Sequence, residues 1–259
     1  MTKHIVAILA ALLAAVMPAA ASLASQADSA YMNEKFDDAA ALYERSITEE
    51  APTADTYYNL GNAYWRAGQA GNAIINYERA LRVDPSHADA RTNLDFARTK
   101  IQDLPEDDSS FLSNLHRDIT SIMSPNAWAV TAFVLFLAVA AMAALYIFSQ
   151  SVAVRKTGFF GGIVLLCFCI YSIVVAAQTA AAPDRHDEAV VIVPTTLLSS
   201  TPKAGQSATD KVVAIHEGTK VLVVDSVSAP GPDGAELWYD VKINNSTRAW
   251  LHAKDVKRI

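Results

Sequence analysis

The sequence has few cysteines and histidines, and none of them lies at the spacing of a metal site. Its two cysteines, Cys167 and Cys169, stand two positions apart inside an apolar run, which predicts neither a disulfide framework nor a four-ligand zinc site. The six histidines are scattered. His216 and Glu217 begin like the helical zinc-protease motif, but Lys220 stands where the second histidine is needed. We therefore expect no metal and no other cofactor.

Positive charge and catalytic motifs are also scarce. The 259 residues include 21 Lys and Arg against 27 Asp and Glu, a net charge of −6, so the chain lacks the basic face that nucleic-acid binding requires. There is no Gly-x-Ser-x-Gly nucleophile elbow and no glycine-rich phosphate loop ending in Lys-Ser or Lys-Thr. We therefore expect neither a nucleic-acid-binding protein nor an enzyme, and we assign no catalytic residue.

Charged side chains are missing altogether from two stretches, residues 119–154 and 157–183. Each stretch contains the roughly 20 apolar residues that a helix needs to cross the hydrocarbon of a bilayer. The sequence therefore predicts transmembrane helices at about residues 127–148 and 159–178, joined as a hairpin over 126–180. Neither span holds an acidic, basic or histidine side chain of the kind that pumps use, which argues against transport.

Two features predict the orientation of this hairpin in the membrane. Arg155 and Lys156 are the only charges of the connecting loop, 149–157, and positive charge favours the cytoplasmic side. At the N-terminus, residues 1–24 combine a basic start, an apolar run and a stretch ending at Ala24 that suits signal peptidase. We interpret them as a cleaved signal peptide, and the alternative is an uncleaved anchor. Either one exports the array after it, so both regions that flank the hairpin are predicted to lie outside the cytoplasm.

Residues 54–87 carry the sequence pattern of a tetratricopeptide (TPR) repeat, a 34-residue unit of two antiparallel helices. Gly61 predicts a close contact between the two helices, and Pro85 predicts the end of the second. A weaker repeat precedes this one and a solvating helix over 86–103 comes after it, so we expect a minimal array over 25–104. The positions that match the repeat are Tyr57, Leu60, Gly61, Tyr64, Ala73, Tyr77, Ala80 and Pro85.

The first helix of the full repeat is expected to line the concave face of the array, where TPR domains bind peptides. Asn59 and Asn62 are candidates for gripping a peptide backbone; alternatively, they are consensus residues without a ligand. Asp28 and Asp89 stand where TPR domains that clamp a carboxylate carry neutral or basic groups, so no carboxylate clamp is predicted. Residues 25–110 hold 16 acidic and eight basic side chains, which favours basic or mixed partners. The candidate peptide-binding residues are Asp55, Tyr58, Asn59, Asn62, Trp65 and Arg66.

Between the array and the hairpin, residues 105–125 begin as an acidic linker and continue as a short amphipathic helix. Phe111, Leu115 and Ile119 recur at helical spacing before Pro125. This helix either lies on the outer surface of the membrane or packs under the repeat array.

After Pro183 the composition changes to β-branched runs separated by turn residues, which predicts a small antiparallel barrel over 185–259. The spacing around Trp238 and Trp250 resembles that of bacterial SH3-like domains, some of which bind peptides or cell-wall peptide stems. Trp238, Tyr239 and Trp250 either line a shallow aromatic site or form the barrel core, and we favour the core. The expected strands are 189–193, 212–215, 220–224, 237–243 and 248–251.

The order of these elements, together with Arg155-Lys156 and the glycine-rich segment 158–162, resembles the BatE-type TPR proteins of bacterial aerotolerance operons. The resemblance covers nearly the whole mature chain. It implies a non-enzymatic protein of the bacterial inner (cytoplasmic) membrane, with its TPR and SH3-like domains in the periplasm. It also implies partners among von Willebrand A-domain membrane proteins with a MoxR-type ATPase, and a role in aerotolerance or envelope stress.

The predicted fold is thus a multidomain membrane protein with an α-helical TPR array, a transmembrane helical hairpin and a small all-β SH3-like barrel. This fold is compatible with two functions from different classes. In the first, the chain is a scaffold whose TPR groove holds another envelope protein. In the second, it is a cell-wall sensor or tether whose barrel holds peptidoglycan.

Overall fold

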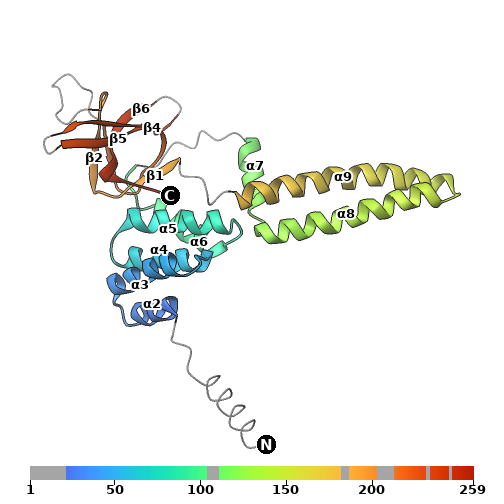
Figure 1. The fold of residues 1–259 in the computed structure, drawn as a ribbon, viewed down its shortest axis with the longest axis horizontal. Coiled ribbons are helices and arrows are strands. Elements are labelled where there is room, and N and C mark those ends of the chain that lie inside the picture. The colour runs from blue at the N-terminus through green and yellow to red at the C-terminus, as the bar shows by residue number, and fades with distance from the viewer. Residues whose placement is uncertain (1–21, 104–110, 182–186, 203–212, 232–233, 245–246) are drawn as a thin grey trace, which may run out of the picture.

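The chain forms three parts: a helical array, a long two-helix hairpin that extends away from it, and a β domain beside the array (Figure 1). This is the fold class that the sequence predicts. The expected signal peptide, apart from its last three residues, and the acidic start of the linker lie outside the described residues. The computed structural model describes residues 22–103, 111–181, 187–202, 213–231, 234–244 and 247–259.

The array consists of five helices: α2 Leu23–Met32, α3 Phe36–Glu49, α4 Ala54–Arg66, α5 Ala70–Val83 and α6 Ala88–Arg98. Helices α4 and α5 form the predicted full repeat, and Gly68, with φ at 80°, makes the turn between them. Helices α2 and α3 form the weaker repeat that precedes it. Helix α6 is the predicted solvating helix, so the array has the minimal size that the sequence indicates.

A helix cap and a glycine explain where α4 begins and how closely it packs. The Thr53 hydroxyl accepts a hydrogen bond from the Thr56 backbone N–H at 3.1 Å and so caps α4. A Cβ atom added at Gly61 would lie 2.6 Å from the Tyr77 ring, which confirms the predicted close contact between α4 and α5. The predicted repeat positions that are buried in this way are Leu60, Gly61, Tyr64, Ala73, Tyr77 and Ala80.

The first turn of α2 includes the residues expected at the signal-peptidase site. The Ser22 hydroxyl accepts from the Ser25 backbone N–H at 3.2 Å, and the Leu23 N–H donates to the Glu50 carboxylate at 3.1 Å. Cleavage before Ser22 would preserve this turn. Cleavage after Ala24 would remove it together with its contact to the end of α3.

Two long helices, α8 (Pro125–Phe148) and α9 (Val152–Ala180), form the hairpin. Both are long and apolar enough to cross a membrane. Only 6% and 17% of the residues in their most apolar windows are buried. The core helices of a soluble protein bury such surface, whereas most residues of these two helices remain partly or fully exposed.

The connection of the hairpin is shorter than the sequence predicts. Helix α9 begins at Val152 instead of residue 159, because Arg155 and Lys156 are good helix formers and continue the helix. The connection therefore contains only residues 149–151. Close to this connection, a Cβ atom added at Gly158 would lie 2.8 Å from the Met142 carbonyl oxygen of α8. This glycine therefore lets the backbones of the two helices approach closely.

Helix α7 (Phe111–Thr120) lies at the base of the hairpin. The His116 Nε2 atom is 3.2 Å from Gln178 Oε1 of α9, and the Tyr171 hydroxyl is 3.3 Å from His116 Nδ1. Phe111, at the start of α7, remains 78% exposed. These contacts connect α7 to the hairpin.

Seven strands are described in the C-terminal region: β1 Glu188–Val191, β2 Thr195–Leu198, β3 Val213–His216, β4 Lys220–Gly231, β5 Gly234–Lys242, β6 Arg248–His252 and β7 Val256–Arg258. Five of them form an antiparallel sheet in the order β6-β5-β4-β1-β7, and β2 pairs with β3. The core of this β domain is a cluster of aliphatic side chains that includes Val191, Ile215, Val221, Val241 and Leu251.

The sequence predicts only some of these strands, and it predicts two of them too short. The prediction omits β2 and β7, because both are short and neither is a run of alternating β-branched residues. It also makes β4 and β5 too short. The extension of β4 from Asp225 to Gly231 is small and polar in sequence, and it is held by pairing with β5 beyond an irregularity after Val223. Backbone pairing rather than side-chain pattern fixes this part of the sheet.

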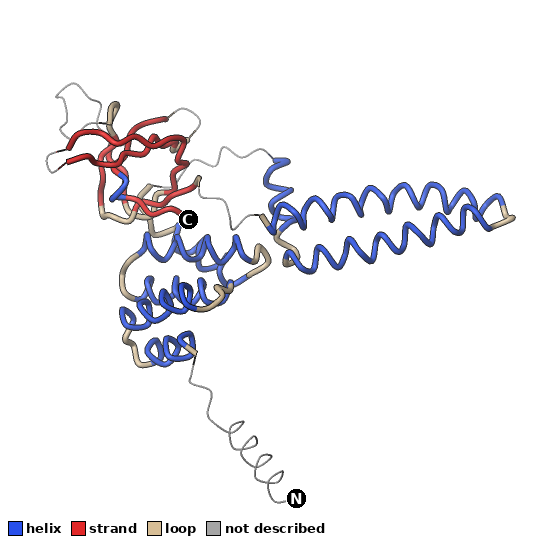
Figure 2. The backbone as a smooth tube through the Cα atoms, viewed as in Figure 1, coloured by secondary structure: helices blue, strands red, loops and turns tan. Residues whose placement is uncertain are grey.

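The β domain packs against the array, although the hairpin separates the two in sequence. Figure 2 shows strands next to the array helices, and β1 contacts α5. Val190 and Ile259 of the β domain join the same buried apolar cluster as Ile74 and Tyr77 of α5. Because these regions precede α8 and come after α9, they lie on the same side of any membrane that the hairpin crosses.

Candidate functional site

A groove runs along the array where α2, α4 and α6 face one another. Two adjoining hollows, of about 180 and 200 Å³, open along it and share Tyr31 and Asn62. Four of the six predicted peptide-binding residues line these hollows: Asn59, Asn62, Trp65 and Arg66. The structure therefore brings most of the predicted site together in one groove.

The first hollow contains an asparagine with unused hydrogen-bonding capacity. The Asn59 side chain has no hydrogen-bond partner among the residues that the structure describes, and it lines the hollow beside Asp28 and Tyr31. The Tyr43 hydroxyl donates to the Asp28 carboxylate there. Burial and this carboxylate raise the pKa of Tyr43, so the phenol stays protonated and keeps donating. The free amide of Asn59 can both donate to and accept from an extended peptide backbone.

Asn62, by contrast, is already engaged within the array. Its amide oxygen accepts hydrogen bonds from the Tyr77 hydroxyl at 2.9 Å and from Asn93 Nδ2 at 2.8 Å. These two bonds connect α4 to α5 and to α6. The structure therefore gives the Asn62 oxygen a supporting role inside the array and leaves Asn59 as the free amide of the groove.

The second hollow combines aromatic rings with a cation. The rings of Trp65 and Phe96 meet edge to face with their centroids 5.6 Å apart, and Phe96 is 51% exposed. The Arg66 guanidinium lies 4.4 Å from the centroid of the Phe36 ring and forms no ion pair with any residue in the described part of the chain. Stacking restricts the guanidinium while leaving its N–H donors available to a carboxylate or carbonyl group.

The remaining two predicted residues lie at the other end of α4. The Asp55 Oδ1 atom is 3.2 Å from His87 Nε2. The Tyr58 ring lies 4.9 Å from the His87 ring and 6.2 Å from the Tyr77 ring, measured between centroids. These contacts tie α4 to α5 and to the start of α6, and neither residue lines the two hollows.

A different face of the array carries the β domain, and we call it the docked face. It is formed by α5 and by the end of the array at Ile101 and Asp103. A Cβ atom added at Gly71 would lie 2.6 Å from the Val191 carbonyl oxygen, and one added at Gly218 would clash with the Ile101 side chain. The Gly71 backbone N–H also donates to the Glu217 carboxylate of the β domain at 2.7 Å. The two parts therefore meet at backbone distance.

Charged side chains alternate along the docked face. Glu78 lies 2.6 Å from Arg98 and 3.3 Å from Lys220. Glu188 lies 3.0 Å from Lys220 and 2.6 Å from Arg82. Burial raises the pKa of Glu188, but Lys220 and Arg82 together outweigh burial and lower that pKa below its usual value. Glu188 is thus held ionised between the two parts.

Asp103 provides a second polar contact between the array and the β domain. It accepts a hydrogen bond from the His216 backbone N–H at 2.6 Å and lies 2.9 Å from His216 Nδ1. The Thr219 hydroxyl donates to the same carboxylate at 3.2 Å. Burial raises the pKa of Asp103, but the bonds from His216 and Thr219 lower it overall.

The three aromatic residues of the predicted barrel site do not share one surface. Trp238 and Tyr239 are consecutive in β5, so their side chains point to opposite faces of the sheet. The register of β5 with β6 places Trp238 and Trp250 on the same face. Tyr239 packs against the core of the β domain. The two tryptophans lie on the other face of the sheet, where Trp238 is buried and Trp250 is partly exposed.

Sequence reasoning missed the docked face. Helix α5 buries eight residues, including Gly71 and the consecutive pair Ile74 and Ile75. Six consecutive residues of this helix, 73–78, are buried, which is more than one covered side of an amphipathic helix accounts for. A glycine inside a helix is also unfavourable unless another segment approaches closely. Gly71 is the sequence signal that could have indicated a second partner for α5.

The comparisons with known proteins agree with the geometry of α4 and α5. Residues 54–87 match the family model of the tetratricopeptide repeat. A curated relative, "Protein SGT1 homolog" from Oryza sativa subsp. japonica, is 32% identical over 68 residues. That match covers 26% of this chain and 18% of the relative, so the chain spans less than a fifth of the relative's length. Residues 54–87 are therefore a tetratricopeptide repeat.

Proposed function

We propose that the chain is a non-enzymatic scaffold of the bacterial inner membrane, and that its TPR groove holds an extended segment of another envelope protein. The observation that carries this proposal is the set of unused binding groups in the groove. These are the free amide of Asn59, the unpaired guanidinium of Arg66 and the accessible ring of Phe96. A protein segment offers their complements, namely backbone amides, carboxylate or carbonyl oxygens, and apolar side chains.

The division of the groove into two small hollows favours an extended peptide over a compact small-molecule ligand. Small-molecule sites usually occupy roughly 300–1,000 Å³, whereas the two hollows measure about 180 and 200 Å³. Because they adjoin at Tyr31 and Asn62, one extended segment can place two of its side chains in them. The acidic excess of residues 25–110 favours a segment of basic or mixed charge.

The hairpin supports a membrane location for this scaffold. Its two helices have the length and composition of membrane spans, and their apolar surface is uncovered. The docking of the β domain onto α5 puts both soluble parts on one side, as a two-span hairpin requires. Arg155 and Lys156 at the tip then favour a cytoplasmic tip and a periplasmic array.

The resemblance to BatE-type proteins supplies the biological setting of the proposal. In that setting the scaffold acts in aerotolerance or envelope-stress complexes. Its candidate partners are von Willebrand A-domain membrane proteins with a MoxR-type ATPase, and the SH3-like domain holds the array in place from the docked face.

Site-specific crosslinking tests the groove. A photoreactive amino acid replaces Asn59 inside the groove or, as the control, Arg45, which is exposed on α3 and paired only with its neighbour Glu49 among the described residues. The proposal expects an adduct with an envelope protein from position 59 and much less from position 45. Equal adducts at both positions, or none at position 59, would contradict it. Mass spectrometry of the adduct then tests the von Willebrand A-domain assignment.

Fusions of alkaline phosphatase test the membrane arrangement. The enzyme is active only in an oxidising compartment, because it needs disulfides. We expect activity when it is fused after Lys100 and none when it is fused after Ser151, in the short connection of the hairpin. Activity after Ser151 would contradict the periplasmic placement of the array.

A cell-wall tether remains the second candidate function. It is favoured by one observation in the β domain: Trp238 and Trp250 share a face that is not the main core, and the Trp238 indole N–H is buried with no hydrogen-bond partner in the described residues. Sedimentation of the purified chain with isolated cell-wall sacculi tests it. Co-sedimentation that is lost in Trp250→Ala and kept in Arg66→Ala would support the tether over the scaffold.

A further inference from the structure

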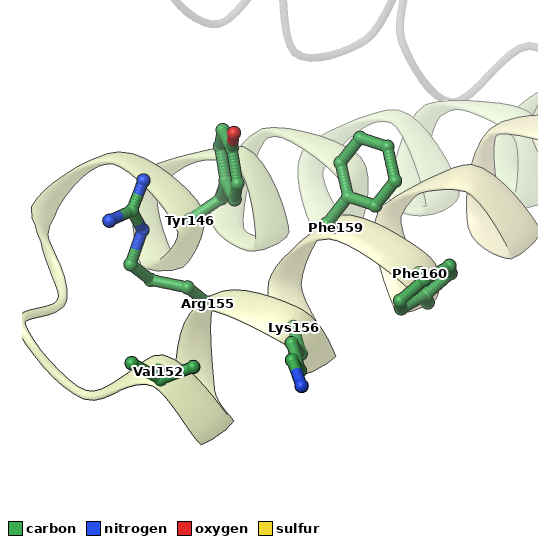
Figure 3. Close-up of a pocket in the computed structure, with 6 residues that line it drawn as sticks. All are labelled: Tyr146, Val152, Arg155, Lys156, Phe159 and Phe160. Atoms are coloured by element: carbon green, nitrogen blue, oxygen red, sulfur yellow. The ribbon is translucent and has the colours of Figure 1, made fainter.

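A third hollow lies at the tip of the hairpin, at the end farthest from the array (Figures 1 and 3). Its volume is about 300 Å³, larger than either hollow of the groove. It is formed by the last turn of α8 and the first turns of α9. The residues that line it are Tyr146, Val152, Arg155, Lys156, Phe159 and Phe160.

The two cations of this hollow have no anionic partner among the residues that the structure describes. The sequence contains no Asp or Glu between Asp118 and Asp184. The Arg155 guanidinium lies over the Tyr146 ring, 5.3 Å from its centroid, and Lys156 forms no ion pair with any described residue. Figure 3 shows Arg155 reaching toward Tyr146 while Lys156 points to the other side of the helix. Two adjacent positive charges at the end of an apolar hairpin are therefore available to an anion.

Apolar surface continues from these cations along α9. Phe159 and Phe160, one turn farther along the helix, are 47% and 64% exposed. The face is continuous, because residues three and four apart in a helix lie on one side. A ligand that fits this arrangement carries an anionic head and long apolar chains.

We propose that the tip of the hairpin binds the phosphate of an anionic phospholipid, with Arg155 at the phosphate, Lys156 adding positive charge from the adjacent side of α9, and the phenylalanine rings along the acyl chains. The inference rests on the membrane insertion proposed above. Insertion places the tip at the head-group level, where basic residues and aromatic rings gather. A free phosphate ion would use the cations only, whereas a phospholipid also covers Phe159 and Phe160.

Native mass spectrometry of the full chain tests this site. The chain is reconstituted in nanodiscs made of equal parts of phosphatidylglycerol and phosphatidylcholine, then released with mild detergent. Each cation contributes to attraction of anionic lipid, so we expect phosphatidylglycerol to be retained over phosphatidylcholine by a factor on the order of ten. Arg155→Gln with Lys156→Gln should abolish the preference. Equal retention of the two lipids by the unmodified chain would overturn the proposal.

A second variant separates the site from the general charge of the tip. Gln150→Arg combined with Arg155→Gln keeps the number of positive charges at the tip but moves one away from Tyr146. We expect it to lose most of the preference; full preference would show a diffuse charge effect and overturn the site. Excess inorganic phosphate should leave the lipid bound. Complete displacement by phosphate would show a free-anion site instead.

The lipid proposal and the proposed function fail in distinguishable ways. Washing membranes at alkaline pH tests insertion without reference to the tip, and release of the chain would contradict the membrane location itself. Crosslinking from position 59 tests the scaffold. Insertion and crosslinking that persist while the lipid preference is absent would reject the lipid site alone.

Discussion

The groove and the docked face are two surfaces of one helical array, and they differ in how their polar groups are satisfied. On the docked face, Gly71, Glu78 and Glu188 all have partners within 3.3 Å. In the groove, Asn59 has no partner among the described residues and Arg66 contacts only an aromatic ring there. Satisfied polar groups stabilise a fold, whereas accessible unsatisfied groups remain available to a ligand. The docked face therefore holds the molecule together, whereas the groove is the surface that we propose binds a partner.

The docked face also explains how so short an array is stable. Stacked repeats need neighbours on both sides to bury a continuous core. Here Val190 and Ile259 of the β domain cover apolar side chains of α5 that would otherwise be exposed, and they join the core of the array. The β domain thus acts as an end cap for the array, so its removal is expected to weaken the array as well. Truncation of the chain is therefore a poor way to test the groove, and point substitutions are better.

The largest expected effect comes from breaking the docked face at its closest point. Gly71→Leu places a side chain where even a Cβ atom would lie 2.6 Å from the Val191 carbonyl oxygen. Overpacking of this kind costs about 1–3 kcal/mol. Thermal unfolding of the purified chain should show a clear drop in Tm. An unchanged Tm would mean that the β domain does not dock on α5 as described.

A smaller loss is expected from removing one charge of the docked face. Glu188→Gln leaves Lys220 and Arg82 without a shared carboxylate. Because Glu188 is partly exposed, we expect a loss of about 1–2 kcal/mol. Denaturant unfolding measures it, with Glu49→Gln on the exposed surface of α3 as the matched control. A Glu188→Gln curve that matches the control would mean that the ion pairs of Glu188 with Lys220 and Arg82 do not stabilise the fold.

The carboxylates of the docked face predict that the stability of docking depends on pH. The pKa values of Glu188 and Asp103 are lowered in the folded protein, so both groups stabilise docking above their ordinary values, roughly pH 4. That stability is lost as the pH falls through the lowered values. Protease sensitivity should therefore rise below about pH 4, and the rise should be smaller in Glu188→Gln. Identical pH profiles for the variant and the unmodified chain would contradict this assignment.

The smallest effect on stability distinguishes the two asparagines of α4. Asn62→Ala removes the acceptor of the Tyr77 hydroxyl and of Asn93, which should cost about 1 kcal/mol. Asn59→Ala removes no described bond and should stay within about 0.5 kcal/mol. Chemical unfolding of both variants compares them directly. A larger loss of stability in Asn59→Ala than in Asn62→Ala would mean that Asn59, and not Asn62, supports the array.

The sequence predicts the parts of the molecule that are encoded locally. Gly61 and Tyr77 lie at fixed offsets in one repeat, and two long uncharged runs mark the hairpin, so both could be read without a structure. The docked face could not, because Gly71 and Val191 are 120 positions apart and meet only after the hairpin returns the chain. The roles of Asn59 and Asn62 also required coordinates. Both fit the same pattern, and only the positions of Tyr77 and Asn93 separate them.

Capture of partner proteins by three forms of the chain tests whether the groove binds a partner while the docked face holds the fold. Membranes with the unmodified chain, Asn59→Ala with Arg66→Ala, or Glu188→Gln are crosslinked, and the envelope proteins that co-purify are quantified. We expect at least about a tenfold loss of capture in the groove variant, since one neutral and one charged contact are removed, with only a small change in its Tm because Arg66 also stacks on Phe36. We also expect retained capture in Glu188→Gln below the melting temperature. Retained capture in the groove variant together with loss in Glu188→Gln would mean that the groove is not the binding surface.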